Sequence, residues 1–193
     1  MKVGKHVLVE KPSVSNAIEC QALFDFHASI PEATRPVLLE AFHTRFHPAW
    51  YAFLSSIDSA AVQNVQSSFS IYRGFFPLKN QIRYEYELAG GSLLDIGTYG
   101  VTAIREAFGT EPVKCLDGKA RMHLDSQTID EGLKATFRFP NGGIGSIDGD
   151  LARQGWMGLP KFEMSKISVE QREVRSRGVR KLGMERCITR LEE

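Results

Sequence analysis

The stretch that decides the fold begins at residue 6 and reads His6-Val7-Leu8-Val9-Glu10-Lys11-Pro12. Its short apolar, β-branched run predicts a fully buried strand. Apolar residues then recur at helical spacing from Ile18 to Phe26, and we expect the serine hydroxyls within 13–15 to cap this helix. A second buried strand is predicted over 37–42. Strand, helix and strand in this order predict a parallel βαβ unit.

The pattern changes near residue 48. Pro48 is well placed as the first residue of a helix, and from Val65 apolar and polar residues alternate as in a half-buried strand. A second alternating stretch, 133–139, ends in Pro140-Asn141-Gly142-Gly143, which predicts a hairpin turn and a returning strand. One more strand region is expected within 162–169. The fold class is therefore α/β, with a parallel part over 1–50, an α+β part over 51–170 and an irregular charged tail over 171–193.

The charges nearly balance, with 24 Lys+Arg against 23 Asp+Glu and a net charge of +1. Such a chain has no general field for nucleic acid or an anionic membrane, so we expect a small-molecule partner. The three cysteines, at 20, 115 and 187, form no CxxC pair, which argues against a disulfide framework and a zinc site. No apolar run approaches the roughly 20 residues of a membrane span, and we expect a cytoplasmic protein.

Two candidate sites follow the predicted parallel strands, at the sheet edge where ligands bind in open α/β folds. Lys11, in Glu10-Lys11-Pro12, is placed to hydrogen-bond a reacting hydroxyl, or it is a surface lysine that begins a loop. The Lys11-Pro12 bond is a candidate cis peptide. On the same edge, His43-Thr44-Arg45-Phe46-His47-Pro48 offers Arg45 or His47 to a polyol or phosphate, with a solvated loop as the alternative. The strand exit and Pro48 argue against a helical His pair for metal.

The third candidate is Gly90-Gly91-Ser92-Leu93-Leu94-Asp95-Ile96-Gly97-Thr98-Tyr99. Ser92 and Asp95 have capping-box spacing, so we expect a helix to begin here, with Asp95 and Tyr99 on one face. A tyrosine beside a lysine ammonium can act as a general acid or base, because the positive charge stabilises the phenolate. The alternative is a capping Asp95 and a partly buried Tyr99 with a satisfied hydroxyl.

Other catalytic and nucleotide-binding signals fail. Gly143-Ile144-Gly145 has Asp148 where a GxGxxG turn needs its third glycine, and it lies in the predicted hairpin. GxSxG and Walker A motifs are absent from the sequence, so hydrolase and P-loop NTPase functions have no support.

Residues 4–12 and 90–99 together resemble, in order, two hallmark segments of the Gfo/Idh/MocA oxidoreductase family. The resemblance is greatest to its branch of dimeric dihydrodiol dehydrogenases and NADP-dependent D-xylose dehydrogenases, to which 40–48 and 155–158 are also similar. It implies the remnant of a Rossmann parallel sheet, followed by an α+β domain with an open, mostly antiparallel sheet. Relative to that family we expect a chain truncated at its N-terminus and altered after Val169.

The resemblance also implies site residues and a reaction. Tyr99 would take the proton from a sugar or trans-diol hydroxyl, such as that of D-xylose on its way to the lactone, as hydride passes to NADP. Lys11 would stabilise the phenolate and orient the hydroxyl, and Asp95 would line the same pocket. The other implied contacts are near the nicotinamide for Glu10, Lys11, Pro12 and Arg45, and near the substrate for Phe46 and Trp156, with no metal.

The glycine-rich turn that seats the pyrophosphate in this family is not in the sequence, so we expect weak binding of NADP, with NAD not excluded. A different function class stays open for the same reason. In that alternative the chain is a non-catalytic module derived from the family, which binds a sugar or pairs with a full-length subunit. The resemblance further implies a homodimer formed through the open sheet.

Overall fold

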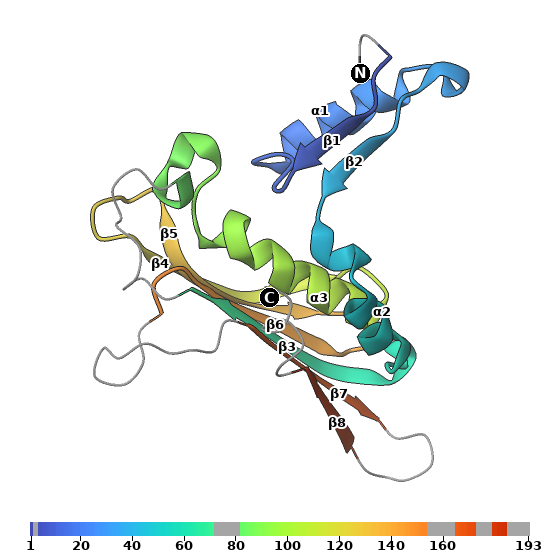
Figure 1. The fold of residues 1–193 in the computed structure, drawn as a ribbon. Helices are drawn as coiled ribbons and strands as arrows, with labels where there is room; N and C mark the ends of the chain where they lie inside the picture. Colours follow the sequence, from blue (N-terminus) through green and yellow to red (C-terminus); the bar gives the residue numbers. More distant parts are fainter. Residues whose placement is uncertain (2–3, 72–81, 154–164, 173–178, 185–193) are drawn as a thin grey trace. The chain divides into compact units, whose positions relative to one another are not determined.

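A computed structural model describes residue 1 and residues 4–71, 82–153, 165–172 and 179–184, the last range by its backbone. The chain divides into two compact units, Met1–His47 and Pro48–Glu193. Each unit has its own sheet (Figure 1).

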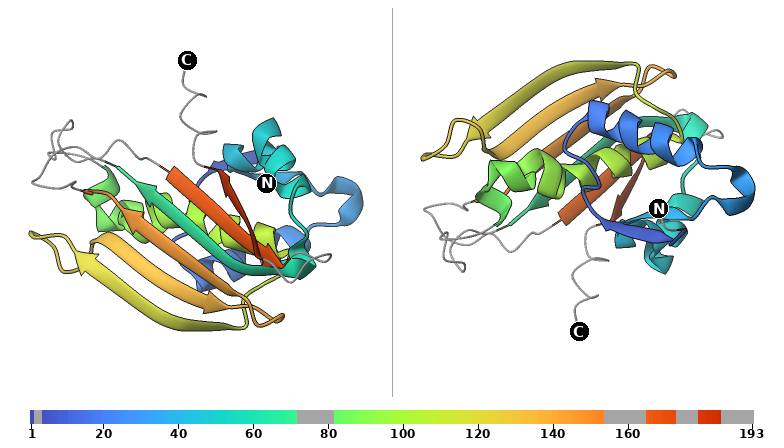
Figure 2. Two further views of the ribbon diagram at one scale, coloured as in Figure 1. Left: turned by 90° about the horizontal axis from the view of Figure 1, so that it is seen from below. Right: turned by 90° about the horizontal axis from the view of Figure 1, so that it is seen from above.

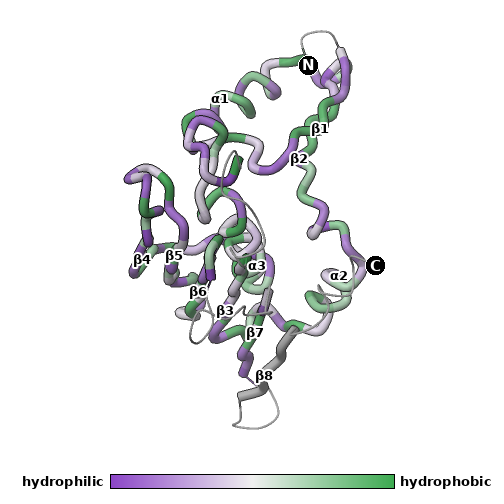
Figure 3. Tube along the Cα trace, turned by 60° about the vertical axis from the view of Figure 1, so that its left-hand side comes forward, coloured by the Kyte–Doolittle hydropathy of each residue, from purple (hydrophilic) through white to green (hydrophobic). Residues whose placement is uncertain are grey.

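The first unit is a βαβ arrangement, as the sequence predicts. Strands β1 (Val7–Glu10) and β2 (Leu38–Ala41) pair in parallel, with Val7 opposite Leu38 and Glu10 opposite Ala41. Figure 3 shows both strands as largely hydrophobic. Helix α1 (Ala17–Ala28) and the short 3-10 turn η1 (Glu32–Thr34) connect β1 to β2. A second 3-10 turn, η2 (His43–Phe46), follows β2.

Two details of this unit correct the prediction. The strands are not fully buried: Leu8 is 68% exposed, and Leu39 is also exposed, because a sheet of two strands leaves these side chains uncovered. The cap of α1 is Asn16, whose side chain accepts from the Glu19 amide at 3.0 Å, and not a serine. The Ser13 hydroxyl instead donates to the Glu40 carboxylate at 2.9 Å, which ties the loop after β1 to β2.

The second unit is built on a sheet of six strands within the described residues, in the order β4-β5-β6-β3-β7-β8. Strands β3 and β6 pair in parallel and every other neighbouring pair is antiparallel. The strand bounds are β3 (Val62–Ser70), β4 (Lys114–Met122), β5 (Asp130–Arg138), β6 (Ile144–Asp150), β7 (Ser165–Arg172) and β8 (Val179–Met184). The open, mostly antiparallel sheet is therefore confirmed.

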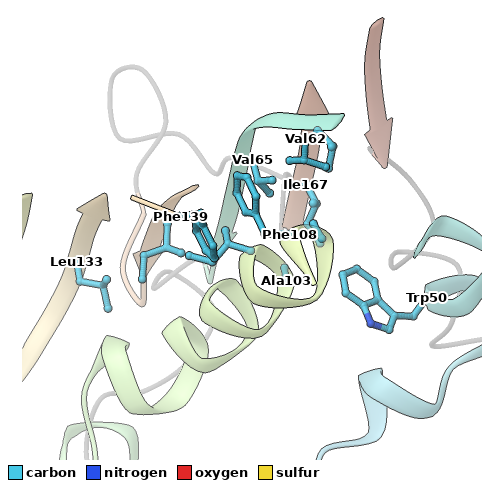
Figure 4. Close-up of a cluster of buried hydrophobic side chains, with 12 residues drawn as sticks. Trp50, Val62, Val65, Ala103, Phe108, Leu133, Phe139 and Ile167 are labelled. Atoms are coloured by element: carbon cyan, nitrogen blue, oxygen red, sulfur yellow. The ribbon is translucent and has the colours of Figure 1, made fainter. Parts of the chain in front are cut away.

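One face of this sheet carries the core. Helix α3 (Thr98–Phe108) lies across it, over β3 and β6 (Figure 2). The core joins Trp50 of helix α2 (Pro48–Ser55) to buried side chains of the sheet and of α3, including Val65, Ile104 and Phe139 (Figure 4). The remaining short elements of the unit are η3 (Ser59–Ala61), η5 (Ile82–Tyr84), η6 (Tyr86–Leu88) and the π-helical turn η7 (Leu93–Gly97).

The predicted hairpin is confirmed, and the predicted tail is not. Gly142 has φ +84° in the turn between β5 and β6, where the Phe139 amide donates to the Gly143 carbonyl at 2.9 Å. Strand β8 lies within the stretch that we expected to be irregular and pairs with β7. Backbone hydrogen bonds to a neighbouring strand hold it, so it needs no apolar period. Among the described residues no helix is long and apolar enough to cross a membrane.

Candidate functional site

The first group of candidate residues lies at the carboxyl edge of the parallel strands β1 and β2. Lys11 and Pro12 follow β1 directly, and their peptide bond is cis. Arg45 and Phe46 lie in η2, just beyond β2, where Arg45 is exposed and Phe46 is 57% exposed. Because parallel strands end at the same edge, the fold brings these loops to one side of the sheet, as predicted. Glu10 ends β1 and is exposed.

The second group lies at the start of α3. The π-helical turn η7 (Leu93–Gly97) precedes α3 directly, so Asp95 and Tyr99 fall on one continuous helical segment. The predicted capping box does not form. Ser92 already has helical dihedral angles, and its buried hydroxyl has no hydrogen-bond partner among the described residues.

The Asp95 side chain forms an ion pair. Arg83, in η5 (Ile82–Tyr84), donates through Nε to Asp95 Oδ2 at 2.7 Å. The Asp95 side chain is 19% exposed, so its carboxylate is partly withdrawn from water while the guanidinium supports its negative charge. Arg83 is a residue that sequence reasoning missed, because it is 12 positions from Asp95 and no helical spacing connects them.

The Tyr99 ring packs against an aromatic side chain of the sheet. Its ring stacks on Phe69 of β3, with centroids 5.5 Å apart and planes inclined by 24°. Stacking of this kind restricts the tilt of the phenol ring and leaves its hydroxyl at the ring's far end. The alternation along β3 predicted the strand but not this contact. Tyr99 and Asp95 thus each have a neighbour that fixes their side chain, Phe69 for one and Arg83 for the other.

The amides at the start of the helix are bound by Asp130, which lies at the beginning of β5. Its Oδ2 accepts from the Leu93 amide at 2.7 Å, and the backbone of Ser92 also hydrogen-bonds the carboxylate. Burial raises the pKa of Asp130, and the hydrogen bonds from Leu93, from its own backbone and from Ser92 oppose this shift. Sequence reasoning missed Asp130, which is 37 positions from Leu93.

The structure places the candidate residues in both units. Lys11 and Arg45 belong to the first and Asp95 and Tyr99 to the second. Trp156, expected near the substrate, lies outside the described residues, together with the similar stretch 155–158. In the parts of the chain that are described, no group of three or more His, Cys, Asp or Glu side chains is placed to hold a metal ion.

We tested the fit of a dinucleotide on the first unit. The carboxyl edge of β1 and β2 carries Lys11 and Arg45, and this is the edge at which open α/β folds bind ligands. The start of α1 does not suit its pyrophosphate. There Asn16 binds the Glu19 amide, and Glu19 Oε2 accepts from the Ser15 amide at 2.9 Å, so a carboxylate already occupies the anion position.

Comparison with known proteins gives a match to a family model. Residues 56–164 match the model described as the GFO/IDH/MocA C-terminal domain. D-xylose 1-dehydrogenase (NADP(+)) 2 of Haloferax volcanii is 41% identical over 112 residues, which cover 55% of this chain and 32% of the relative. Trans-1,2-dihydrobenzene-1,2-diol dehydrogenase of Xenopus tropicalis is 29% identical over 136 residues, 70% of this chain and 39% of the relative. The chain thus spans about a third to two fifths of these relatives.

Solved structures share the fold across almost the whole chain. Aldose-aldose oxidoreductase from Caulobacter crescentus, complexed with glycerol, superposes with a TM-score of 0.70 at 19% identity, covering 95% of this chain and 54% of that one. A 3-ketoreductase from Actinomadura kijaniata, in complex with TDP-benzene and NADP, has a TM-score of 0.66 at 19% identity, with 95% and 59% covered. At such identities the likeness concerns the fold.

Proposed function

Because the chain belongs to the GFO/IDH/MocA family, we propose that it is an oxidoreductase that oxidises a hydroxyl of a sugar or trans-diol. D-xylose is the first substrate to test, since the relative with 41% identity is a D-xylose 1-dehydrogenase. The observation that carries the proposal is the arrangement at the start of α3, within the matched region. There Asp95 is ion-paired with Arg83, and the Tyr99 ring is stacked on Phe69.

In this proposal each residue has one task. The Tyr99 oxygen, as phenolate, would take the proton of the substrate hydroxyl while the hydrogen on the same carbon leaves as hydride for the cofactor, which gives a carbonyl or lactone. As the resemblance implies, Lys11 would stabilise the phenolate, and Asp95 would orient the sugar by accepting from a second hydroxyl. When bound, NADP supplies the hydride acceptor, and Glu10, Lys11, Pro12 and Arg45 would hold its nicotinamide end. Phe46 and Trp156 would contact the substrate.

We propose that this chain binds NADP weakly. At the start of α1 the Glu19 carboxylate accepts from the Ser15 amide, so a pyrophosphate would meet a negative charge there. Titration of NADPH with fluorescence detection tests this point. Saturation only well above micromolar concentration is expected, and micromolar affinity would contradict the weak-binding proposal. Binding of a sugar without any binding of NADP would instead support the alternative of a non-catalytic module.

The activity is tested by incubating the purified chain with D-xylose and saturating NADP and following the absorbance of the reduced nicotinamide. Tyr99→Phe removes the proton acceptor and should abolish turnover. Tyr51→Phe is the matched control, because Tyr51 is 56% exposed on α2 and the change removes the same hydroxyl. Undiminished turnover by Tyr99→Phe would remove Tyr99 from the mechanism.

We also propose that two copies pair through the sheet face that is turned away from α3. Ser68, Lys134 and Asp148 are neighbours in register on that face, across β3, β5 and β6. They line a groove of about 290 Å³ together with Gln66, Thr136, Ser146, Lys166 and Ser168. Charges of both signs allow such a face to complement itself about a two-fold axis. Sedimentation should show a dimer that Asp148→Lys weakens, and a wild-type monomer would contradict the proposal.

A further inference from the structure

The helical segment that carries Asp95 and Tyr99 is anchored by a residue from the sheet. Among its first amides, that of Leu93 donates to Asp130 Oδ2 at 2.7 Å. The Ser92 backbone hydrogen-bonds the same carboxylate, whereas the Ser92 hydroxyl contributes nothing, being buried without a partner. A carboxylate at this end also suits the partial positive charge of a helix N-terminus. Asp130 therefore does from β5 what a local cap does in other helices.

The turn before the helix is shaped around this carboxylate. Gly91 has φ +114°, and a Cβ placed on it would lie 2.2 Å from Asp130 Oδ1. Any side chain at position 91 would therefore displace the carboxylate. Asp130 itself is fixed by the sheet, where β5 lies between β4 and β6. The anchor thus joins a rigid strand to a turn that accommodates it.

Three further hydrogen bonds link this turn to Asp95. The Asp95 amide donates to the Gly91 carbonyl at 3.0 Å, and the Gly91 amide donates to the Arg83 carbonyl at 2.8 Å. The Arg83 side chain then donates back to the Asp95 carboxylate at 2.7 Å. These contacts form a closed loop of three residues, and Asp130 holds the Ser92–Leu93 peptide inside it. A shift of that peptide is passed to Asp95 and, one turn further on, to Tyr99.

We infer that Asp130 is a positioning residue of the proposed site, which sets the place of Asp95 and Tyr99 by holding the Ser92 and Leu93 amides from strand β5. The inference rests on the proposed function for its effect on catalysis. It does not rest on it for the anchoring itself, which is a property of the folded chain. Asp130 binds the backbone of Ser92 and Leu93, so its effect on Asp95 and Tyr99 is transmitted along the helical segment that carries all four residues.

The test compares Asp130→Ala, Asp130→Asn and Asp117→Ala in the full chain. Asp117 is an exposed carboxylate on the neighbouring strand β4 and serves as the control. Amide hydrogen exchange is the first readout. We expect exchange at Ser92, Leu93 and Asp95 to rise at least about tenfold in Asp130→Ala, the equivalent of one lost hydrogen bond to a charged group. Exchange at Phe108, near the end of α3, should not change.

The second readout is the kinetics of sugar oxidation. Misplacement of the helix start should lower kcat about a hundredfold in Asp130→Ala while the KM for NADP stays constant. Asp130→Asn retains one acceptor oxygen and should restore part of both effects, which a loss of general stability would not explain. It also serves as the working variant if the alanine variant does not fold.

Three results would overturn the inference. Unchanged exchange at Leu93 in both variants would remove the anchor, and equal acceleration along all of α3 would make Asp130 a general stabiliser. Altered exchange with unchanged kcat would remove the catalytic role. If the wild type itself does not oxidise any sugar or diol, the proposed function and this catalytic role fail together, and the exchange measurement still decides the anchoring separately.

Discussion

Replacing Gly91 by alanine tests the turn in front of α3. Two costs add at this position. A non-glycine residue at φ +114° stores about 1–3 kcal/mol of backbone strain. The new Cβ would lie 2.2 Å from Asp130 Oδ1, so the carboxylate has to move and lose its bond to the Leu93 amide, which costs about 1.5–3 kcal/mol. The free energy of unfolding should fall by about 2.5–6 kcal/mol.

Gly142→Ala is the matched control. Gly142 also has a positive φ, +84°, but a Cβ there would meet nothing within 4 Å, so only the strain remains. Urea unfolding followed by circular dichroism gives both free energies, and their difference measures the clash with Asp130. Adding Asp130→Ala should bring the cost of Gly91→Ala down to that of Gly142→Ala. Equal costs for the two glycine variants in the wild-type background would refute the reasoning.

Two other predictions concern the core and the pH dependence. Phe139→Ala should lower the free energy of unfolding by about 3–5 kcal/mol. The Phe139 side chain is 1% exposed, and its ring stacks on that of Phe108 with the centroids 3.9 Å apart. Phe24→Ala is the control and should cost far less, because Phe24 is 57% exposed. Burial raises the pKa of Asp130, so the folded chain binds this proton more tightly than the unfolded chain and ionised Asp130 costs stability. The stability of the wild type relative to Asp130→Asn should therefore rise as pH falls through the raised pKa toward the ordinary value of about 3.9. A difference in the free energy of unfolding between the two proteins that does not change with pH would contradict this.

Much of the fold was predictable because its signals are local. The apolar run of β1, the alternation along β3 and β5, and the glycine-rich turn after Phe139 each act over fewer than about ten residues. The parallel pairing of β1 with β2 followed from the order of elements alone. Strand β8 was missed because its pairing partner, and not its own pattern, makes it a strand.

The site was predictable only in part. Asp95 and Tyr99 became candidates because they stand in one recognisable stretch, and Lys11 because it follows a strand; their roles stay predictions. The residues that bind the helix start were not predicted. Arg83 comes from a 3-10 turn 12 positions from Asp95, and Asp130 from a strand 37 positions from Leu93. The local capping pattern at Ser92 was misleading, because the Asp95 amide, which a capping serine would bind, donates to the Gly91 carbonyl instead.

We propose that the chain transfers hydride directly from a sugar carbon to a nicotinamide, with Tyr99 taking the proton. Incubation with NADP and D-xylose deuterated at C1, followed by mass spectrometry of the nicotinamide product, tests it most directly. We predict reduced cofactor that carries one deuterium from the sugar with the wild type and with Tyr51→Phe, and none with Tyr99→Phe. Reduced cofactor without deuterium, or the same deuterated product from Tyr99→Phe, would contradict the account.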